Sequence, residues 1–101
     1  MTRLDVISSF IDENEKVIDV GCDQALLSKI LAKRHIYSVA SDIRENIIKK
    51  ASSSVGEEYK KYISFRVGDG ITLFPNELDY TAVLSGMGTY TILNIIMRTN
   101  I

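Results

Sequence analysis

Short β-branched segments alternate with segments of helical periodicity along this chain, and this alternation restricts the fold more than any other feature. Four apolar, β-branched runs predict strands, at 16–20, 37–41, 63–67 and 78–84. Four segments with apolar residues at helical spacing predict helices, at 4–11, 25–32, 43–55 and from 92 to the C-terminus. Strands that alternate with helices predict an α/β fold with a parallel sheet and right-handed crossovers.

The composition fits one globular domain. Apolar residues make up 46% and charged residues 25% of the 101 residues. The formal net charge of −1 gives no overall electrostatic attraction to nucleic acid. The chain has a single cysteine, no apolar run of membrane length and no secretory pattern at its start. We therefore expect a cytoplasmic protein that does not bind a membrane.

Glycine or aspartate stands at the end of every predicted strand. The residues concerned are Asp19, Gly21, Asp23, Asp42, Asp69, Gly70, Gly86 and Gly88. Because ligands of parallel α/β sheets bind outside the carboxyl ends of the strands, this coincidence predicts a binding site. Ordinary turn chemistry is the alternative, since both residue types favour turns.

The first of these loops, at 21–26, indicates which ligand the site takes. A dinucleotide-binding fingerprint would need glycine two and five positions after Gly21, where this chain has Asp23 and Leu26. The Asp23 carboxylate would repel a pyrophosphate but attract a cation. S-adenosylmethionine carries a sulfonium and an ammonium and has no phosphate, so the loop favours this cofactor over NAD. Alternatively, Asp23 is a helix N-cap.

Two further aspartates are candidate contacts to the adenosine part of that cofactor. Asp42 lies about 20 residues after Gly21, where an acidic residue commonly binds the ribose hydroxyls. Its alternative role is to cap the helix predicted to start at Ile43. Asp69 can accept a hydrogen bond from the exocyclic amine of adenine, or it belongs to an ordinary Asp-Gly turn.

The loop after the fourth predicted strand contains Gly86, Met87 and Gly88. If this strand lies beside the first, the loop is at the switch point of the sheet, where cofactor and substrate meet. Met87 would then pack on a flat ring, or it is a core residue of a turn. We expect no metal site, because the sequence has no Cys/His cluster, and we expect Cys22 to be a packing residue.

Four segments together resemble a known family. Residues 18–27, Ile-Asp-Val-Gly-Cys-Asp-Gln-Ala-Leu-Leu, resemble the first motif of class I S-adenosylmethionine-dependent methyltransferases. The resemblance is closest to the bacterial tRNA (adenine-N1) methyltransferases that modify adenine 22. Arg3-Leu4, residues 66–71 and residues 85–89 are similar to further segments of that family in the same order.

The resemblance implies a Rossmann-like methyltransferase domain with strand order 3-2-1-4, followed in the family by a helical domain that helps to hold tRNA. By position, Asp19, Gly21 and Asp23 would border the methionine part of the cofactor. Asp42 would bind the ribose, although the family usually has Glu there. The remaining positions imply an adenine-side loop at Asp69 and Gly70, and a loop near the transferred methyl at Gly86 and Met87.

This chain departs from the family in two residues and in length. Gln24 replaces a histidine and Thr89 a glycine, which implies an impaired enzyme or another target base. The family domain has about seven strands, and only four are predicted here. Residues 1–101 would thus be a partial domain that ends after the fourth strand, without the later strands and the RNA-binding domain. Its exposed fourth-strand edge would be open to pairing with a second copy in a homodimer.

Three functions remain open at this point. The first is methyl transfer to N1 of an adenine in tRNA, with Asp23 as the catalytic residue that stabilises the charge developing on the base. The second is a non-catalytic module that binds S-adenosylmethionine or supports a partner. The third is another nucleotide-binding α/β protein, such as an NAD enzyme, against which Asp23 argues.

Overall fold

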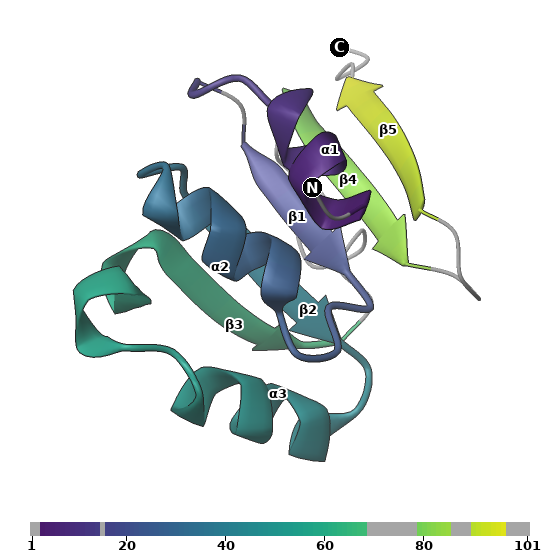
Figure 1. The fold of residues 1–101 in the computed structure, drawn as a ribbon. Helices are drawn as coiled ribbons and strands as arrows, with labels where there is room; N and C mark the ends of the chain where they lie inside the picture. The colour runs from purple at the N-terminus through teal and green to yellow at the C-terminus, as the bar shows by residue number, and fades with distance from the viewer. Residues whose placement is uncertain (1–2, 15, 69–78, 86–89, 97–101) are drawn as a thin grey trace, which may run out of the picture.

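The computed structural model describes residues 3–14, 16–68, 79–85 and 90–96. Within this part of the chain, helices and strands alternate up to β3 and are followed by two further strands (Figure 1). The elements are α1 (Arg3–Ser9), β1 (Val17–Val20), α2 (Leu26–Lys33), β2 (Ser38–Asp42), α3 (Glu45–Ser53), the 3₁₀ helix η1 (Glu57–Tyr62), β3 (Ile63–Val67), β4 (Asp79–Ser85) and β5 (Tyr90–Ile96).

The strands form one sheet in the order β3-β2-β1-β4-β5. The first four are parallel, so the predicted α/β class and the predicted order 3-2-1-4 are confirmed. Val20 of β1 stands opposite Ser41 of β2 on one side and Leu84 of β4 on the other. The carboxyl ends of these central strands therefore lie at the same edge of the sheet.

The helix predicted from residue 92 onward is wrong over residues 92–96, where the structure describes the chain. Residues Tyr90–Ile96 form β5, which pairs antiparallel with β4 and places Ile92 opposite Val83. The segment is rich in β-branched threonine and isoleucine, which favour strands. Pairing also satisfies backbone groups of β4 that would otherwise form an open edge. The edge of β4 is therefore covered within the chain, and the homodimer expected through that edge loses its basis.

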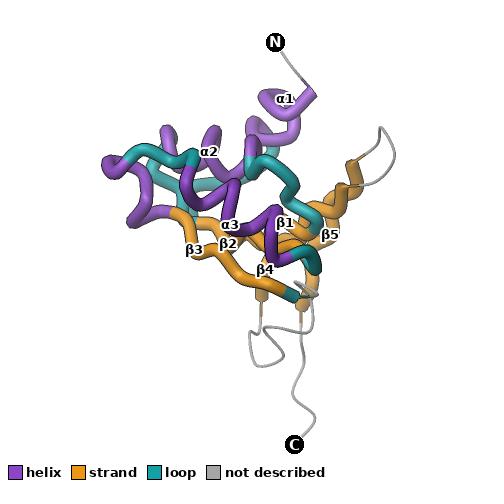
Figure 2. The backbone as a smooth tube through the Cα atoms, turned by 90° about the horizontal axis from the view of Figure 1, so that it is seen from below, coloured by secondary structure: helices purple, strands orange, loops and turns teal. Residues whose placement is uncertain are grey.

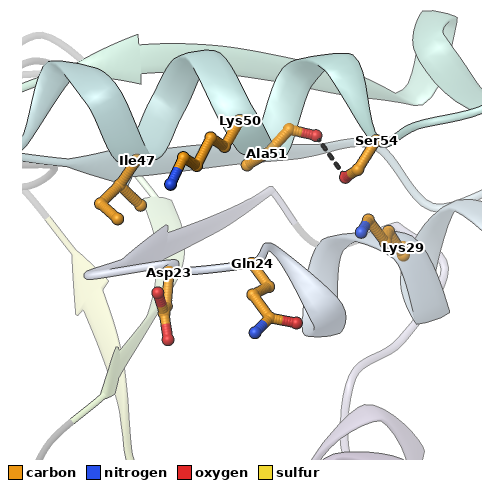
Figure 3. A pocket seen from close by; sticks show the side chains of 7 residues that line it. All are labelled: Asp23, Gln24, Lys29, Ile47, Lys50, Ala51 and Ser54. Carbon is orange, nitrogen blue, oxygen red and sulfur yellow. Dashed lines mark hydrogen bonds between the residues drawn. The ribbon is translucent and has the colours of Figure 1, made fainter.

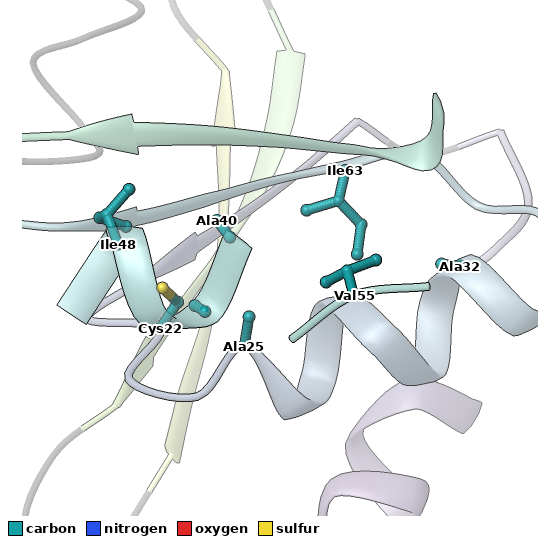
Figure 4. Close-up of a cluster of buried hydrophobic side chains, with 8 residues drawn as sticks. Cys22, Ala25, Ala32, Ala40, Ile48, Val55 and Ile63 are labelled. Atoms are coloured by element: carbon teal, nitrogen blue, oxygen red, sulfur yellow. The ribbon is translucent and has the colours of Figure 1, made fainter. Parts of the chain in front are cut away.

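All three α-helices lie on one side of the sheet (Figure 2). Apolar residues of α1 and α2, and of the segments that follow these helices, pack with strand residues of β1 and β4 in one buried cluster: Ile7, Ile11, Val17, Leu27, Leu31, Ile36 and Val83. A second cluster joins α2 and α3 to β2 and β3 (Figure 4): Cys22, Ala25, Ala32, Ala40, Ile48, Ala51, Val55 and Ile63. Burial of these faces is the main driving force that holds the helices to the sheet.

Arg34, directly after α2, attaches α1 to the rest of the domain. Its Nη1 donates to the carbonyl oxygen of Ser8 and, at 3.0 Å, to the Ser8 hydroxyl. Its Nη2 donates to the carbonyl oxygen of Ile11 at 3.0 Å. These acceptors lie in the last turn of α1 and just after it, where helix carbonyls lack partners within the helix. One guanidinium thus caps α1 from a neighbouring helix.

The 3₁₀ helix η1, which is not expected from the sequence pattern, lies between Gly56 and β3. A 3₁₀ helix brings residues three apart onto one side, and Lys60 Nζ lies 3.0 Å from Glu57 Oε1. Among the described residues, no helix has the length and apolar character needed to cross a membrane.

Candidate functional site

Two backbone hydrogen bonds join the loops that follow β1 and β3 to the end of β2. The N–H of Cys22 donates to the carbonyl oxygen of Ser41 at 2.8 Å. The N–H of Gly68 donates to the carbonyl oxygen of Asp42 at 2.9 Å. The predicted residues Gly21, Asp23 and Asp42 are thereby brought together at the carboxyl edge of the sheet.

The loop between β1 and α2 has an unusual backbone. Gly21, Asp23 and Ala25 have φ angles of 70°, 50° and 58°, all in the left-handed region. The loop closes on itself through a 2.8 Å hydrogen bond from the Ala25 N–H to the Cys22 carbonyl oxygen. Glycine adopts this region without the steric cost that a Cβ brings, which explains Gly21 at the first turn.

Asp23 is not the N-cap of α2, so the capping alternative is wrong. The N-cap is Ala25, and no side chain caps the helix there. The Asp23 side chain is instead exposed at the loop surface. Its carboxylate is thus available to a ligand at the carboxyl edge of the sheet.

Asp42 lies at the end of β2 with its side chain only 3% exposed. Its Oδ1 accepts hydrogen bonds from the Arg44 backbone N–H at 3.0 Å and from Arg44 Nε at 2.9 Å. Its Oδ2 accepts from Arg44 Nη2 at 3.0 Å and from the Asp23 N–H at 3.4 Å. The Arg44 guanidinium lowers the pKa of Asp42, so this carboxyl group is ionised at neutral pH.

The alternative role of Asp42 as the N-cap of the helix after β2 is also wrong. The N-cap of α3 is Arg44, so Asp42 precedes the N-cap by two residues. Its side chain closes a turn onto the Arg44 N–H rather than capping the first turn of the helix. Asp42 therefore stands where sequence reasoning placed a ribose contact.

Asp19 is buried beneath the loop, with 3% of its surface exposed. Its pKa is raised to about 7, mainly by burial, and the nearby Asp42 charge acts in the same direction. Because it is buried, Asp19 offers almost no surface to a ligand. The role of Asp19 in cofactor binding stays a prediction. Its buried position suits a residue that supports the loop between β1 and α2.

Cys22 belongs to the buried cluster between α2, α3 and the sheet, which confirms its expected packing role. Burial raises the pKa of its thiol to about 12, and the neighbouring Asp19 and Asp42 charges act in the same direction. The thiol is therefore protonated at neutral pH and is not poised as a nucleophile.

A pocket of about 390 Å³ lies between the first loop, α2 and α3 (Figure 3). Asp23 and Gln24 of the loop line one side, and Lys50 of α3 extends from the other. Gln24, which departs from the family pattern, thus lies beside the candidate catalytic residue. Within the described ranges, no group of three or more His, Cys, Asp or Glu residues could hold a metal ion.

The remaining predicted residues, Asp69, Gly70, Gly86 and Met87, lie outside the described part of the chain. Their assignments stay predictions.

Arg44 is a site residue that was not predicted from the sequence. The pattern that could have indicated it is a basic residue two positions after an aspartate at a strand end. The long side chain of an arginine in that position can fold back so that its guanidinium binds the carboxylate.

The whole chain, residues 1–101, matches the family model described as a methyltransferase domain. The protein therefore belongs to the methyltransferase domain family. No curated protein matches the sequence. S-adenosylmethionine is the methyl donor of such domains, and solved structures similar to this chain hold the cofactor product S-adenosyl-homocysteine.

Solved structures confirm the Rossmann-like fold. Streptococcus pneumoniae Sp1610, assigned as a tRNA (m1A22) methyltransferase, matches with a TM-score of 0.71 and 24% identity over 85% of this chain. M. capricolum TrmK with S-adenosyl-homocysteine matches with a TM-score of 0.73 and 21% identity, also over 85% of this chain. The chain spans 40% and 41% of the length of these two proteins.

The structure of a Salinibacter ruber RNA methyltransferase in complex with S-adenosyl-homocysteine is similar to this chain over almost the whole length of both proteins. The match covers 100% of this chain and 95% of that protein, with a TM-score of 0.64 and 12% identity.

Proposed function

We propose that this chain is the cofactor-binding part of an S-adenosylmethionine-dependent methyltransferase that acts on N1 of an adenine in tRNA. One observation carries the cofactor part of the proposal. The Asp42 carboxylate lies at the end of β2, and its Oδ2 accepts a 3.4 Å hydrogen bond from the backbone N–H of Asp23 in the first loop. An acidic group in this place suits the two ribose hydroxyls of an adenosine.

The surroundings of that carboxylate fit this cofactor better than a dinucleotide. Asp23 is exposed beside Asp42, and the loop offers a carboxylate where a pyrophosphate would need bare backbone. A sulfonium and an ammonium are attracted by such an acidic loop. When bound, S-adenosylmethionine supplies an electrophilic methyl group on a positively charged sulfur.

The chemical work of the chain is positioning and charge stabilisation. Asp42 would fix the ribose, and Gly21 would let the loop approach the methionine part. As the positive charge passes to the adenine, the exposed Asp23 carboxylate would stabilise it. Asp69 and Gly70 are proposed for the adenine side, and Gly86 and Met87 for the loop beside the methyl.

The substrate is proposed from the family resemblance and from the likeness to a tRNA (m1A22) methyltransferase. A net charge of −1 gives the chain little attraction of its own for RNA. We therefore propose that tRNA is held mainly by regions beyond this chain, in the cytoplasm. A non-catalytic cofactor-binding module is the second candidate, because Gln24 stands where the family has a histidine.

Calorimetry with S-adenosyl-homocysteine tests the cofactor site. We expect binding by the chain, and binding about tenfold to a hundredfold weaker in Asp42→Ala, because a hydrogen bond to a charged group is lost. Glu13→Ala is the matched control, since Glu13 is an exposed carboxylate before β1, at the opposite edge of the sheet. Absent binding by the folded chain, unchanged binding in Asp42→Ala, or tighter binding of NAD would each refute the assignment.

Methylation of tRNA tests the activity. The measurement is transfer of a labelled methyl group from S-adenosylmethionine to tRNA, followed by mapping of the modified base. Transfer to N1 of an adenine by a protein that contains this chain supports the enzyme. Cofactor binding without transfer by that protein favours the non-catalytic module.

A further inference from the structure

Every acceptor position of the Asp42 carboxylate is in use in this structure. Oδ1 accepts from the backbone N–H and the Nε of Arg44, and Oδ2 accepts from Arg44 Nη2 and the Asp23 N–H. An ionised carboxylate has about four lone-pair sites. A ribose that binds through its two hydroxyls therefore has to replace some of these donors.

The four donors differ in how easily they can leave. Two are backbone N–H groups, fixed by the turn before α3 and by the loop after β1. The other two belong to the Arg44 guanidinium, on a side chain that is 55% exposed. The Asp42 end of this ion pair is buried, but the Arg44 guanidinium is exposed, so water can solvate the guanidinium when it leaves. The guanidinium is thus the group that a ligand can displace.

We propose that the Arg44 guanidinium occupies the ribose-binding oxygens of Asp42 in the ligand-free protein and is displaced by a ligand with a vicinal diol. This inference rests on the proposed role of Asp42 in binding the cofactor. Arg44 then sets the affinity for the ribose, because each binding event must first break the two guanidinium hydrogen bonds. The backbone N–H donors stay in place and keep the carboxylate oriented.

The ion pair itself can be tested without any ligand. The carboxyl carbon of Asp42 is titrated by NMR in the full chain and in Arg44→Ala. We expect the Asp42 pKa to rise in Arg44→Ala, because the guanidinium that lowers it is gone. Lys49→Ala is the control, since it removes one exposed positive charge from the same helix, where Lys49 pairs with Glu45. An Asp42 pKa that is unchanged in Arg44→Ala would overturn the proposal.

The competition is tested by calorimetry with S-adenosyl-homocysteine. We expect Arg44→Ala to bind this probe about threefold to tenfold more tightly, since the two guanidinium hydrogen bonds to Asp42 need not be broken first. Arg44→Lys should lie between the two, because an ammonium cannot bridge both oxygens as a guanidinium does. Lys49→Ala should match the wild type. Unchanged or weaker binding in Arg44→Ala would refute the competition.

A double variant separates this inference from the cofactor assignment. Asp42→Ala with Arg44→Ala should bind no more tightly than Asp42→Ala alone, because the gain requires the carboxylate. A gain that persists without Asp42 would refute the inference and leave the cofactor assignment intact. Absence of binding in every variant, with the chain folded, would refute the cofactor assignment and with it the displacement.

Discussion

The backbone N–H of Cys22 donates a 2.8 Å hydrogen bond to the carbonyl oxygen of Ser41, one step beyond the pairing of Val20 with Ser41. This bond extends the contact between β1 and β2 into the loop that carries Asp23. The loop can follow this path only if the chain turns sharply at Gly21, which has a φ of 70°. The conformation of Gly21 thus determines whether Asp23 reaches Asp42.

Gly21→Ala should lower the free energy of unfolding by about 1–2 kcal/mol, because a Cβ is strained in the left-handed region. It should also weaken binding of S-adenosyl-homocysteine, since the loop would shift. Urea denaturation and calorimetry measure the two effects. Gly56→Ala is the matched control: Gly56 has a φ of −65°, and an added Cβ would lie 3.8 Å from Glu58 Oε1. Equal losses of stability in both variants would contradict the role of Gly21.

Asp19 should make the stability of the protein fall as pH rises. Its pKa is raised to about 7 in the folded chain, above its unfolded value near 3.8, so the folded state binds more protons between these values. The unfavourable contribution is absent below pH 4 and complete above pH 7, at roughly 3–5 kcal/mol. Asp19→Asn should remove this loss. Denaturation curves from pH 4 to 8 measure it, and an equal pH slope in both proteins would contradict the prediction.

The sheet was largely predictable because buried parallel strands are short β-branched runs, and β3 has the bounds that the sequence predicts. The final strand, β5, was not predictable from the sequence. Isoleucine and leucine at 92, 93, 95 and 96 fit helical spacing as well as a strand, and pairing with β4 decides between them. Such pairing is a tertiary interaction that the apolar pattern of the segment itself does not report.

The candidate site was predictable at the level of position. Parallel strands bring their carboxyl ends together, so Gly21, Asp23 and Asp42 could be placed at one edge from the sequence. The contacts that surround these side chains could not be predicted from the sequence. The burial of Asp19 depends on how α2 packs over β1, and the ion pair of Asp42 depends on the side-chain conformation of Arg44.

Arg34→Ala should lower the free energy of unfolding by about 1–3 kcal/mol, because acceptors of Ser8 and Ile11 lose their donor. Amide hydrogen exchange should accelerate most in α1. Arg34→Lys should recover only part of the stability, since an ammonium cannot reach both residues as a guanidinium does. Lys33→Ala, an exposed neighbouring change, is the control. Unchanged exchange in α1 of Arg34→Ala would show that the guanidinium does not hold this helix.

Cys22 should resist alkylation in the native protein. Burial raises the pKa of its thiol to about 12, and only 6% of the residue is exposed. At pH 8 the reactive thiolate is then about a thousandfold scarcer than in the unfolded chain, where the pKa is near 8.5. Because the sequence contains one cysteine, mass-detected labelling with iodoacetamide reports this site alone. Labelling should be slow in buffer and fast in urea, and rapid labelling in buffer would contradict the burial of Cys22 between the helices and the sheet.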